Sequence, residues 1–390
     1  MQNFTFHNPI RIHFGKGQIA QLSEELPKQG NILLVYGGGS IKKNGVYDQV
    51  QRSIQQRKVY EFAGIEPNPT YETCMKAVRE IHEKKIEFVL AVGGGSVLDA
   101  TKLIVAAAKY TGADPWDLVE GKAAVNDALP WGCVLTLPAT GSEMNSFSVI
   151  SRLSTKQKRA FGSPLVMPLF SILDPESTFS LPSRQVANGI ADAFTHVVEQ
   201  YLTYDVNSPL QDRWAEGILL TLIEEGPKTL VNMTDYDSRA NFMWAATVAL
   251  NGIISVGVVQ DWATHMIGHE LTALYGIDHA RTLALVLPSL LTVMKNGKRG
   301  KLLQYGERIW GIKEKSGKEE LRVTLAIEKT RQFYQSLGIP TRFSDYKEFP
   351  IPPDTPKIVA RRLADQGLAA LGENRDITPQ KVEEILALSA

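Results

Sequence analysis

The sequence has few cysteines, no long apolar segment and no excess of either charge. Only Cys74 and Cys133 occur in 390 residues, too few for a disulfide framework or a cysteine-rich zinc site, and this scarcity favours a reducing cytoplasmic location. No apolar run reaches roughly 18 residues and no signal peptide is visible, so neither a membrane span nor secretion is expected. The 42 Lys+Arg residues balance the 42 Asp+Glu residues, which argues against a nucleic-acid partner.

The first half of the chain alternates short apolar runs with glycine turns and helical spacing. A chain of 390 residues is too long for one comfortable hydrophobic core, so two domains are expected. Residues 31–36 and 86–92 each end at Gly-Gly-Gly-Ser, and residues 71–85 between them have helical periodicity. This order predicts a parallel sheet with crossover helices. A further apolar run covers 132–138, and residues 146–174 predict a hairpin or extended excursion that closes the sheet domain.

The second half shows apolar residues at three- and four-residue spacing and no strong strand signal. Pro182 suits a first helical position, and Gly226-Pro227 and Gly276 suit helix ends. We therefore expect a sheet domain over residues 1–182 and an all-helical domain over residues 183–390.

Two glycine turns are candidates for nucleotide binding. Residues 93–96, Gly-Gly-Gly-Ser, stand between a strand and a helix, where backbone N–H groups and the helix dipole favour a pyrophosphate. The turn lacks the GxGxxG pattern, and the alternative is a tight turn that uses glycine for positive φ. In the turn at 37–40 no acid follows Tyr36, but Lys42 and Lys43 do. A loop of this kind favours NADP over NAD, unless the two lysines are only a solvated pair.

Histidines gather in the predicted helical domain, where four of the seven lie between His196 and His279. Asp192 precedes His196 by four residues, and His265 precedes His269 by the same interval, so each pair shares one helix face. Asp192, His196, His265 and His279 would supply one carboxylate and three imidazoles to a divalent metal, either Fe²⁺ or Zn²⁺. A lone histidine is usually structural, but this clustering favours a metal site.

These segments resemble the iron-containing (group III) alcohol dehydrogenase family along the whole chain, close to its NADP-dependent butanol dehydrogenase and broad aldehyde reductase branch. The resemblance is carried by YGGGSIKKNG, GIEPNPTYET, AVGGGSVLDATK, LTLPATGSEMN, LPSRQVANGIADAFTHVVEQY and DWATHMIGHELTALYGIDHARTLALVLP. It implies a Rossmann-like NADP-binding domain over 1–182 and an all-helical, metal-binding catalytic domain over 183–390, in a dehydroquinate synthase-like architecture. It also implies an active site in the cleft between the domains, and a homodimer.

The resemblance also implies roles for individual residues. The metal ligands would be Asp192, His196, His265 and His279, and His269 would line the active site as a proton relay or as a group that orients His265. The residues expected to contact NADP(H) are Gly38, Ser40, Asn68, Gly94, Gly95, Ser96, Val97, Asp99, Thr136, Thr140, Asn145 and Lys158.

The expected reaction is the reversible reduction of small aldehydes, such as butanal, to primary alcohols. A glycerol or diol dehydrogenase of the same superfamily is the closest alternative. A dehydroquinate synthase-type lyase would need Lys and Arg near the metal for an acidic substrate, whereas apolar residues such as Trp262, Met266 and Leu271 surround the histidines. A non-enzymatic nucleotide-sensing or structural protein would require a broken set of metal ligands, and the set is intact.

Overall fold

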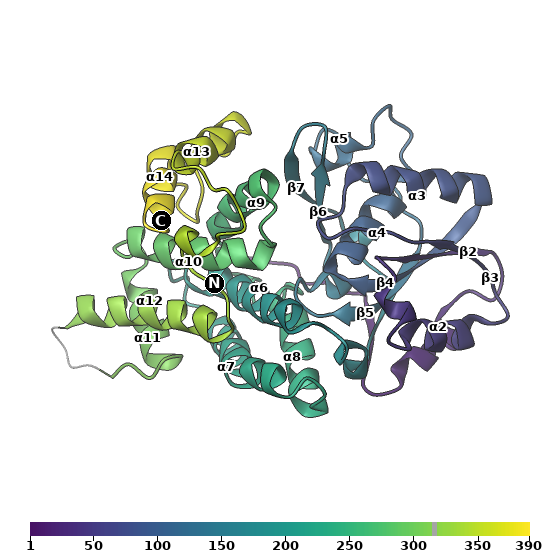
Figure 1. Ribbon diagram of the computed structural model, residues 1–390, viewed down its shortest axis with the longest axis horizontal. Coiled ribbons are helices and arrows are strands. Elements are labelled where there is room, and N and C mark those ends of the chain that lie inside the picture. The colour runs from purple at the N-terminus through teal and green to yellow at the C-terminus, as the bar shows by residue number, and fades with distance from the viewer. Residues whose placement is uncertain (314–317) are drawn as a thin grey trace. The chain divides into compact units, whose positions relative to one another are not determined.

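The computed structural model describes residues 1–313 and 318–390, which form two compact units (Figure 1). The sheet unit comprises His7–Pro182 and Met233–Thr247, and the helical unit comprises Met1–Phe6, Ser183–Asn232 and Val248–Ala390. A single domain boundary after residue 182 therefore does not describe two segments, Met1–Phe6 and Met233–Thr247, each of which belongs to the unit on the other side of that boundary. The first six residues join the helical unit, where the N–H of Gln2 donates to the carbonyl of Gly257 at 2.9 Å. Most of helix α8 joins the sheet unit because Met243 is buried in its core.

A six-stranded parallel sheet forms the centre of the sheet unit. Its strand order is β1-β8-β5-β4-β2-β3, with β1 and β3 at the edges. The strands are β1 (Arg11–Phe14), β2 (Asn31–Tyr36), β3 (Lys58–Phe62), β4 (Ile86–Gly94), β5 (Trp131–Leu137) and β8 (Phe170–Leu173). The predicted parallel sheet is confirmed, as are strands at β2, β4 and β5. The edge strands β1 and β3 were not predicted, because their half-buried, partly charged sequences lack a continuous apolar run.

Helices cover both faces of this sheet (Figure 1). Alternate residues of β2 point to opposite faces: Leu33 and Val35 lie in one apolar core, and Ile32 and Leu34 lie in the other. The first core includes residues of α3 and α4, and the second includes residues of α1 and α2. The helices of this unit are α1 (Leu22–Glu25), α2 (Val46–Ile54), α3 (Tyr71–Lys84), α4 (Gly95–Ala107), α5 (Trp116–Val119) and most of α8 (Tyr236–Ala249).

The predicted hairpin between β5 and β8 is present as a separate two-stranded antiparallel sheet. It consists of β6 (Phe147–Arg152) and β7 (Gln157–Gly162). Asp99 of α4 accepts a hydrogen bond from the backbone N–H of Val149 in β6 at 2.9 Å. The hairpin is thereby fixed to the helix that begins at the second glycine turn.

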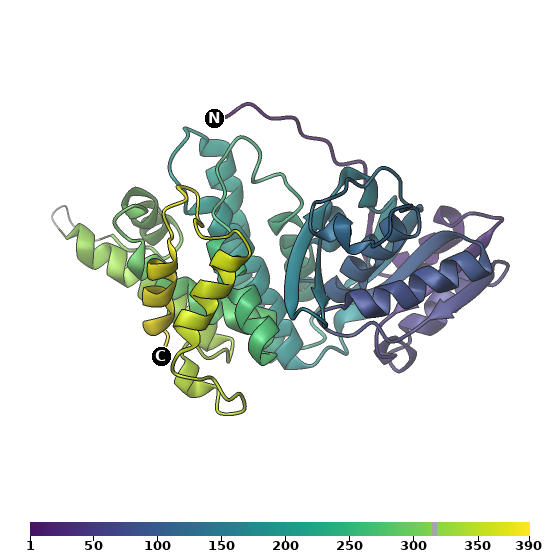
Figure 2. The ribbon, with the colours of Figure 1, turned by 90° about the horizontal axis from the view of Figure 1, so that it is seen from above.

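The helical unit contains the described helices that follow Pro182, apart from most of α8 (Figure 2). They are α6 (Ser183–Tyr201), α7 (Pro209–Val231), α9 (Ala263–Tyr275), α10 (His279–Val293), α11 (Arg299–Arg308), α12 (Glu319–Ser336), α13 (Thr355–Asp365) and α14 (Pro379–Ala387). Gly276 ends α9 in the left-handed conformation, with φ of 72°, as predicted. The predicted helix end at Gly226-Pro227 is wrong, because α7 continues through both residues to Val231. Gly226 is needed for packing instead: a Cβ there would lie 2.9 Å from a side-chain carbon of Ile190 in α6.

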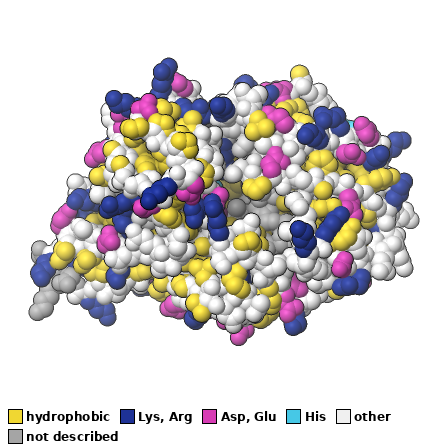
Figure 3. Space-filling model, viewed as in Figure 1, with side chains coloured by type: hydrophobic (Ala, Val, Ile, Leu, Met, Phe, Trp, Pro, Cys, Tyr) yellow, Lys and Arg dark blue, Asp and Glu magenta, His cyan; other side chains and the backbone are white. Residues whose placement is uncertain are grey.

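The surface carries both charges side by side. On the face shown in Figure 3, Lys and Arg side chains lie among Asp and Glu side chains without forming a large patch of one sign. Within the described residues, no helix combines the length and apolar character that a membrane crossing requires.

Candidate active site

Three helices of the helical unit supply the predicted metal ligands. Asp192 and His196 lie one turn apart on α6, and both side chains are buried. His265 lies in the first turn of α9, and His279 is the first residue of α10. The left-handed Gly276 between these two helices reverses the chain, so both histidines reach the carboxylate of Asp192.

The imidazoles converge on one carboxylate oxygen. The Nε2 atoms of His196, His265 and His279 lie 3.7, 3.9 and 3.8 Å from Oδ1 of Asp192. The donor atoms of Asp192, His265 and His279 lie within 4.8 Å of one another. Metal–ligand bonds of about 2.0–2.2 Å place the donors of one site up to about 4 Å apart. Within the described part of the chain, Nε2 of His265 is buried without a hydrogen-bond partner. The group therefore fits one divalent first-row metal ion.

The electrostatics of the cluster are dominated by buried carboxylates. Burial by itself lowers the pKa of His265, but the negative charges of Glu199 and Asp192 outweigh this and raise the pKa to about 9. Without a bound metal ion, this raised pKa favours the doubly protonated imidazolium form of His265 at neutral pH. Metal binding must displace one of its protons, because only a neutral imidazole is a ligand.

Glu199 is a buried member of this cluster that the sequence interpretation missed. Its carboxylate is hydrogen-bonded to Nδ1 of His265, and it accepts a hydrogen bond from the backbone N–H of Thr264 at 2.7 Å. The signal was its spacing, because Glu199 follows Asp192 by seven residues and His196 by three, on the same face of α6.

His269 borders the cluster one turn beyond His265. It is 5% exposed, and its ring centroid lies 4.8 Å from that of His279 and 6.2 Å from that of His265. Among the described residues, the group of mutually close donor atoms contains Asp192, His265 and His279. It includes neither His269 nor the predicted ligand His196, whose Nε2 lies 3.7 Å from Oδ1 of Asp192. Trp262 packs edge-on against His265, with 5.3 Å between ring centroids. His269 and the aromatic ring of Trp262 thus lie beside the proposed metal ligands.

The second glycine turn lies where parallel strands end, the usual position for ligands on such sheets. Gly94 ends β4, and Gly95, Ser96 and Val97 form the first turn of α4. A Cβ on Gly94 would lie 2.8 Å from Leu137, and one on Gly95 would lie 2.6 Å from Thr140. Neither glycine has positive φ, so the tight-turn alternative does not explain them. Close packing against Leu137 and Thr140 therefore requires glycine at both positions at the N-terminus of α4.

The first glycine turn follows the neighbouring strand β2. A Cβ on Gly38 would meet no atom within 4 Å, and Ser40 begins a short 3₁₀ turn, Ser40–Lys42. Lys42 is engaged: its Nζ lies 3.2 Å from Oε2 of Glu61, which also accepts a hydrogen bond from Tyr36 at 2.7 Å. Glu61 belongs to β3, so the sequence directly after β2, where an NAD-binding protein often has an acidic residue, does not reveal it.

A buried polar network holds the loop that follows β5. Asp99 accepts a hydrogen bond from Ser142 at 2.6 Å, and Asn145 donates to the carbonyl of Thr140 at 3.2 Å. Lys102, also absent from the predicted site, donates to Oδ1 of Asn145 at 2.9 Å.

Three further predicted cofactor residues lie on β5, on β7 and in the loop before α3. Thr136 is buried in β5. Lys158 of β7 donates to Oδ1 of Asn68 at 2.7 Å, and Asn68 adopts a left-handed conformation with φ of 56°.

Comparison with known families identifies the chain. The family model for iron-containing alcohol dehydrogenase matches residues 9–175, and the model for the C-terminal part of the Fe-containing alcohol dehydrogenase family matches residues 186–389. The chain belongs to the iron-containing alcohol dehydrogenase family. Asp192, His196, His265 and His279 all lie within the second matched region.

Relatives in this family cover nearly the whole chain. The NADPH-dependent aldehyde reductase YqhD of Escherichia coli is 55% identical over 97% of both chains, and the probable NADH-dependent butanol dehydrogenase 1 of Bacillus subtilis is 44% identical over 100% of both. The crystal structure of E. coli YqhD aligns with 100% of this chain and 99% of its own at a TM-score of 0.97 and 53% identity. The crystal structure of NADH-dependent butanol dehydrogenase A from Thermotoga maritima also aligns with 100% of this chain and 99% of its own, at a TM-score of 0.94 and 36% identity.

Proposed function

We propose that the protein is a metal-dependent, NADP(H)-linked alcohol dehydrogenase, or aldehyde reductase, that interconverts small aldehydes such as butanal and primary alcohols. The observation that carries this proposal is the convergence of three imidazole Nε2 atoms on Oδ1 of Asp192. The relative with 55% identity is named as an NADPH-dependent aldehyde reductase, and other relatives are named as butanol dehydrogenases.

In this proposal residues 1–182 bind the nucleotide and residues 183–390 hold the metal. Asp192, His196, His265 and His279 are the proposed ligands of one Fe²⁺ or Zn²⁺ ion. The proposed contacts to NADP(H) are Gly38, Ser40, Asn68, Gly94, Gly95, Ser96, Val97, Asp99, Thr136, Thr140, Asn145 and Lys158. When bound, NADPH supplies a hydride and the metal ion polarises the carbonyl oxygen of the substrate.

Protein side chains must also manage one proton, because reduction of a carbonyl by hydride leaves an alkoxide. His269 is the proposed group, either as a relay through water or as a residue that orients His265. Replacement of His269 with Ala separates the two: a relay role predicts a changed pH–rate profile, and an orienting role predicts an unchanged profile with weaker metal binding.

A glycerol or diol dehydrogenase is the second candidate activity, and a dehydroquinate synthase-type lyase is the third. The aromatic ring of Trp262, packed edge-on beside His265, favours a substrate with an alkyl chain over a polyol or an acid.

We also propose a cytoplasmic homodimer. Cys74 and Cys133 are free and buried, in keeping with a reducing compartment. The edge strand β1 pairs with β8 on one side and has no strand on its other side among the described residues. An edge of this kind is suited to pairing with a second copy of the chain.

The test is NADPH oxidation followed at 340 nm with butanal, before and after chelation. We expect turnover that a chelator abolishes and that Zn²⁺ or Fe²⁺ restores, with a lower kcat/KM for NADH and for glycerol oxidation. His196→Ala should abolish metal-supported turnover, whereas His82→Ala, a change at an exposed position of α3, should leave it intact. A wild-type protein that is inactive with every divalent metal would overturn the proposal.

A further inference from the structure

We propose that Glu199 is a positioning residue that sets the metal affinity of the site, by fixing the orientation and tautomer of His265 and the start of α9 together. This inference rests on the proposed function, because it takes His265 to be a ligand. Glu199 is not one of the proposed ligands; it contacts Nδ1 of His265, the ring nitrogen that does not face Asp192.

The first observation is that one carboxylate serves two partners on another helix. One oxygen of Glu199 is hydrogen-bonded to Nδ1 of His265, and the other accepts the backbone N–H of Thr264 at 2.7 Å. A carboxylate in this role only accepts, so Nδ1 of His265 is the donor. Nε2 is then the imidazole atom turned toward Asp192, 3.9 Å from its Oδ1.

The second observation is that the start of α9 is capped from two elements. Oδ1 of Asp261, just before the helix, accepts the N–H of Ala263 at 2.8 Å, and Glu199 of α6 accepts the N–H of Thr264 at 2.7 Å. The residue before the helix, Trp262, makes no side-chain cap and has a left-handed backbone with φ of 63°. Each N–H group at a buried helix start needs an acceptor, and Glu199 of α6 provides it for Thr264, the residue before His265. The backbone carbonyl of Glu199 also accepts the N–H of Asp261 at 3.0 Å. The same residue therefore fixes both the backbone and the ring of His265.

Because Glu199 and His265 are buried, a substitution that keeps the shape of Glu199 but removes one acceptor oxygen should still disturb these hydrogen bonds. The side chains of Glu199 and His265 are 2% and 6% exposed, so water cannot replace a lost partner. Glutamine has nearly the same shape but only one acceptor oxygen. If that oxygen faces Thr264, its NH₂ group faces Nδ1 of His265 and moves the imidazole proton to Nε2, which blocks metal binding. If it faces His265, the NH₂ group opposes the N–H of Thr264, which then lacks its acceptor.

The experiment measures metal affinity rather than turnover. The apo forms of wild type, Glu199→Gln and Glu199→Asp are titrated with Zn²⁺ against a chelator, and Co²⁺ is added separately to record its visible spectrum. Glu216→Gln is the matched control, because Glu216 is another buried carboxylate of the helical unit, on α7, with Tyr201 and Arg308 as partners.

We expect Glu199→Gln to raise the Kd for Zn²⁺ by about 10- to 100-fold and to alter the Co²⁺ spectrum. Glu199→Asp keeps both acceptor oxygens and should restore part of the affinity. Glu216→Gln should stay within about twofold of wild type, even where it lowers the Tm of the apo protein, because it contacts no ligand.

Wild-type affinity and spectrum in Glu199→Gln would overturn the proposal, as would an equal loss in Glu216→Gln. If Glu199→Gln did not fold, Glu199→Asp would decide, and an unchanged Kd there would refute the positioning role. A wild-type protein that bound neither metal would refute the proposed function as well. Metal-supported butanal reduction by the wild type, with unchanged affinity in the variants, would refute the role of Glu199 alone.

Discussion

At the scale of single residues, Lys102 is a buried cation whose charge is only partly compensated. It is fully buried in α4 and donates to Asn145 and to the carbonyl of Phe147 at 2.9 and 2.6 Å. Burial lowers its pKa from 10.5 to about 8, against the opposing charges of Asp99 and Glu143. The position thus lowers stability at neutral pH and keeps Asn145 in place.

The pH dependence of stability tests this effect. Between pH 8 and 10.5 the unfolded chain holds more protons at Lys102 than the folded chain, so the free energy of unfolding rises with pH in that window. We expect the free energy of unfolding of the wild type, minus that of Lys102→Met, to rise by about 1 kcal/mol per pH unit. Urea unfolding at several pH values measures it. A difference that does not change with pH for Lys102→Met would contradict the prediction.

At the scale of elements, Gly268 of α9 allows the close approach of α9 and α10. A Cβ on Gly268 would lie 2.8 Å from Oγ1 of Thr282 and 3.2 Å from a methyl carbon of Leu283. Thr282 is one turn beyond His279, and Gly268 is one turn beyond His265. A displacement of α9 from α10 that relieves this contact changes the separation of two proposed ligands.

Gly268→Ala is therefore expected to lower the free energy of unfolding by about 1–3 kcal/mol and to weaken metal binding. Gly217→Ala makes the same chemical change in α7, where nothing lies within 4 Å of the new methyl group. Helix propensity predicts that this control gains up to about 1 kcal/mol without any change in metal affinity. Thermal unfolding and zinc titration measure both effects, and equal results for the two variants would contradict the packing argument.

The elements also show what the sequence could reveal. Strands β2, β4 and β5 were predictable because each is buried along nearly its whole length. Pro227 suggested a helix end, yet it lies in the last turns of α7, where packing against α6 continues the helix. The i,i+4 pair on α6 was visible, whereas the contacts of Glu199 with His265 and of Glu61 with Lys42 join elements far apart in the chain. Local periodicity carries no information about such pairs.

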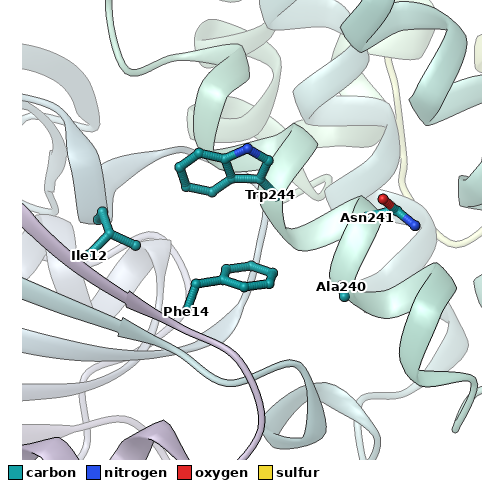
Figure 4. A pocket seen from close by; sticks show the side chains of 5 residues that line it. All are labelled: Ile12, Phe14, Ala240, Asn241 and Trp244. Atoms are coloured by element: carbon teal, nitrogen blue, oxygen red, sulfur yellow. The ribbon is translucent and has the colours of Figure 1, made fainter.

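At the scale of the whole molecule, the proposed homodimer requires a surface that a second copy can cover. Phe14 of β1 and Trp244 of α8 are 38% and 42% exposed, and their rings pack edge to face 5.9 Å apart. With Ile12, Ala240 and Asn241 they line a hollow beside the edge strand, as Figure 4 shows. With formal net charge zero, repulsion between two copies is weak.

The mass in solution, measured by light scattering after gel filtration, tests this assignment. We expect twice the 43.1 kDa chain mass for wild type and a shift toward one chain mass for Phe14→Glu, because a carboxylate buried at a β1 contact would lose its hydration. Val231→Glu, at a side chain that is 90% exposed at the end of α7, is the matched control and should remain dimeric. A wild-type protein of one chain mass at micromolar concentration would refute the dimer. A dimer that Phe14→Glu leaves intact would place the contact on another surface, because the edge strand could not then be its centre.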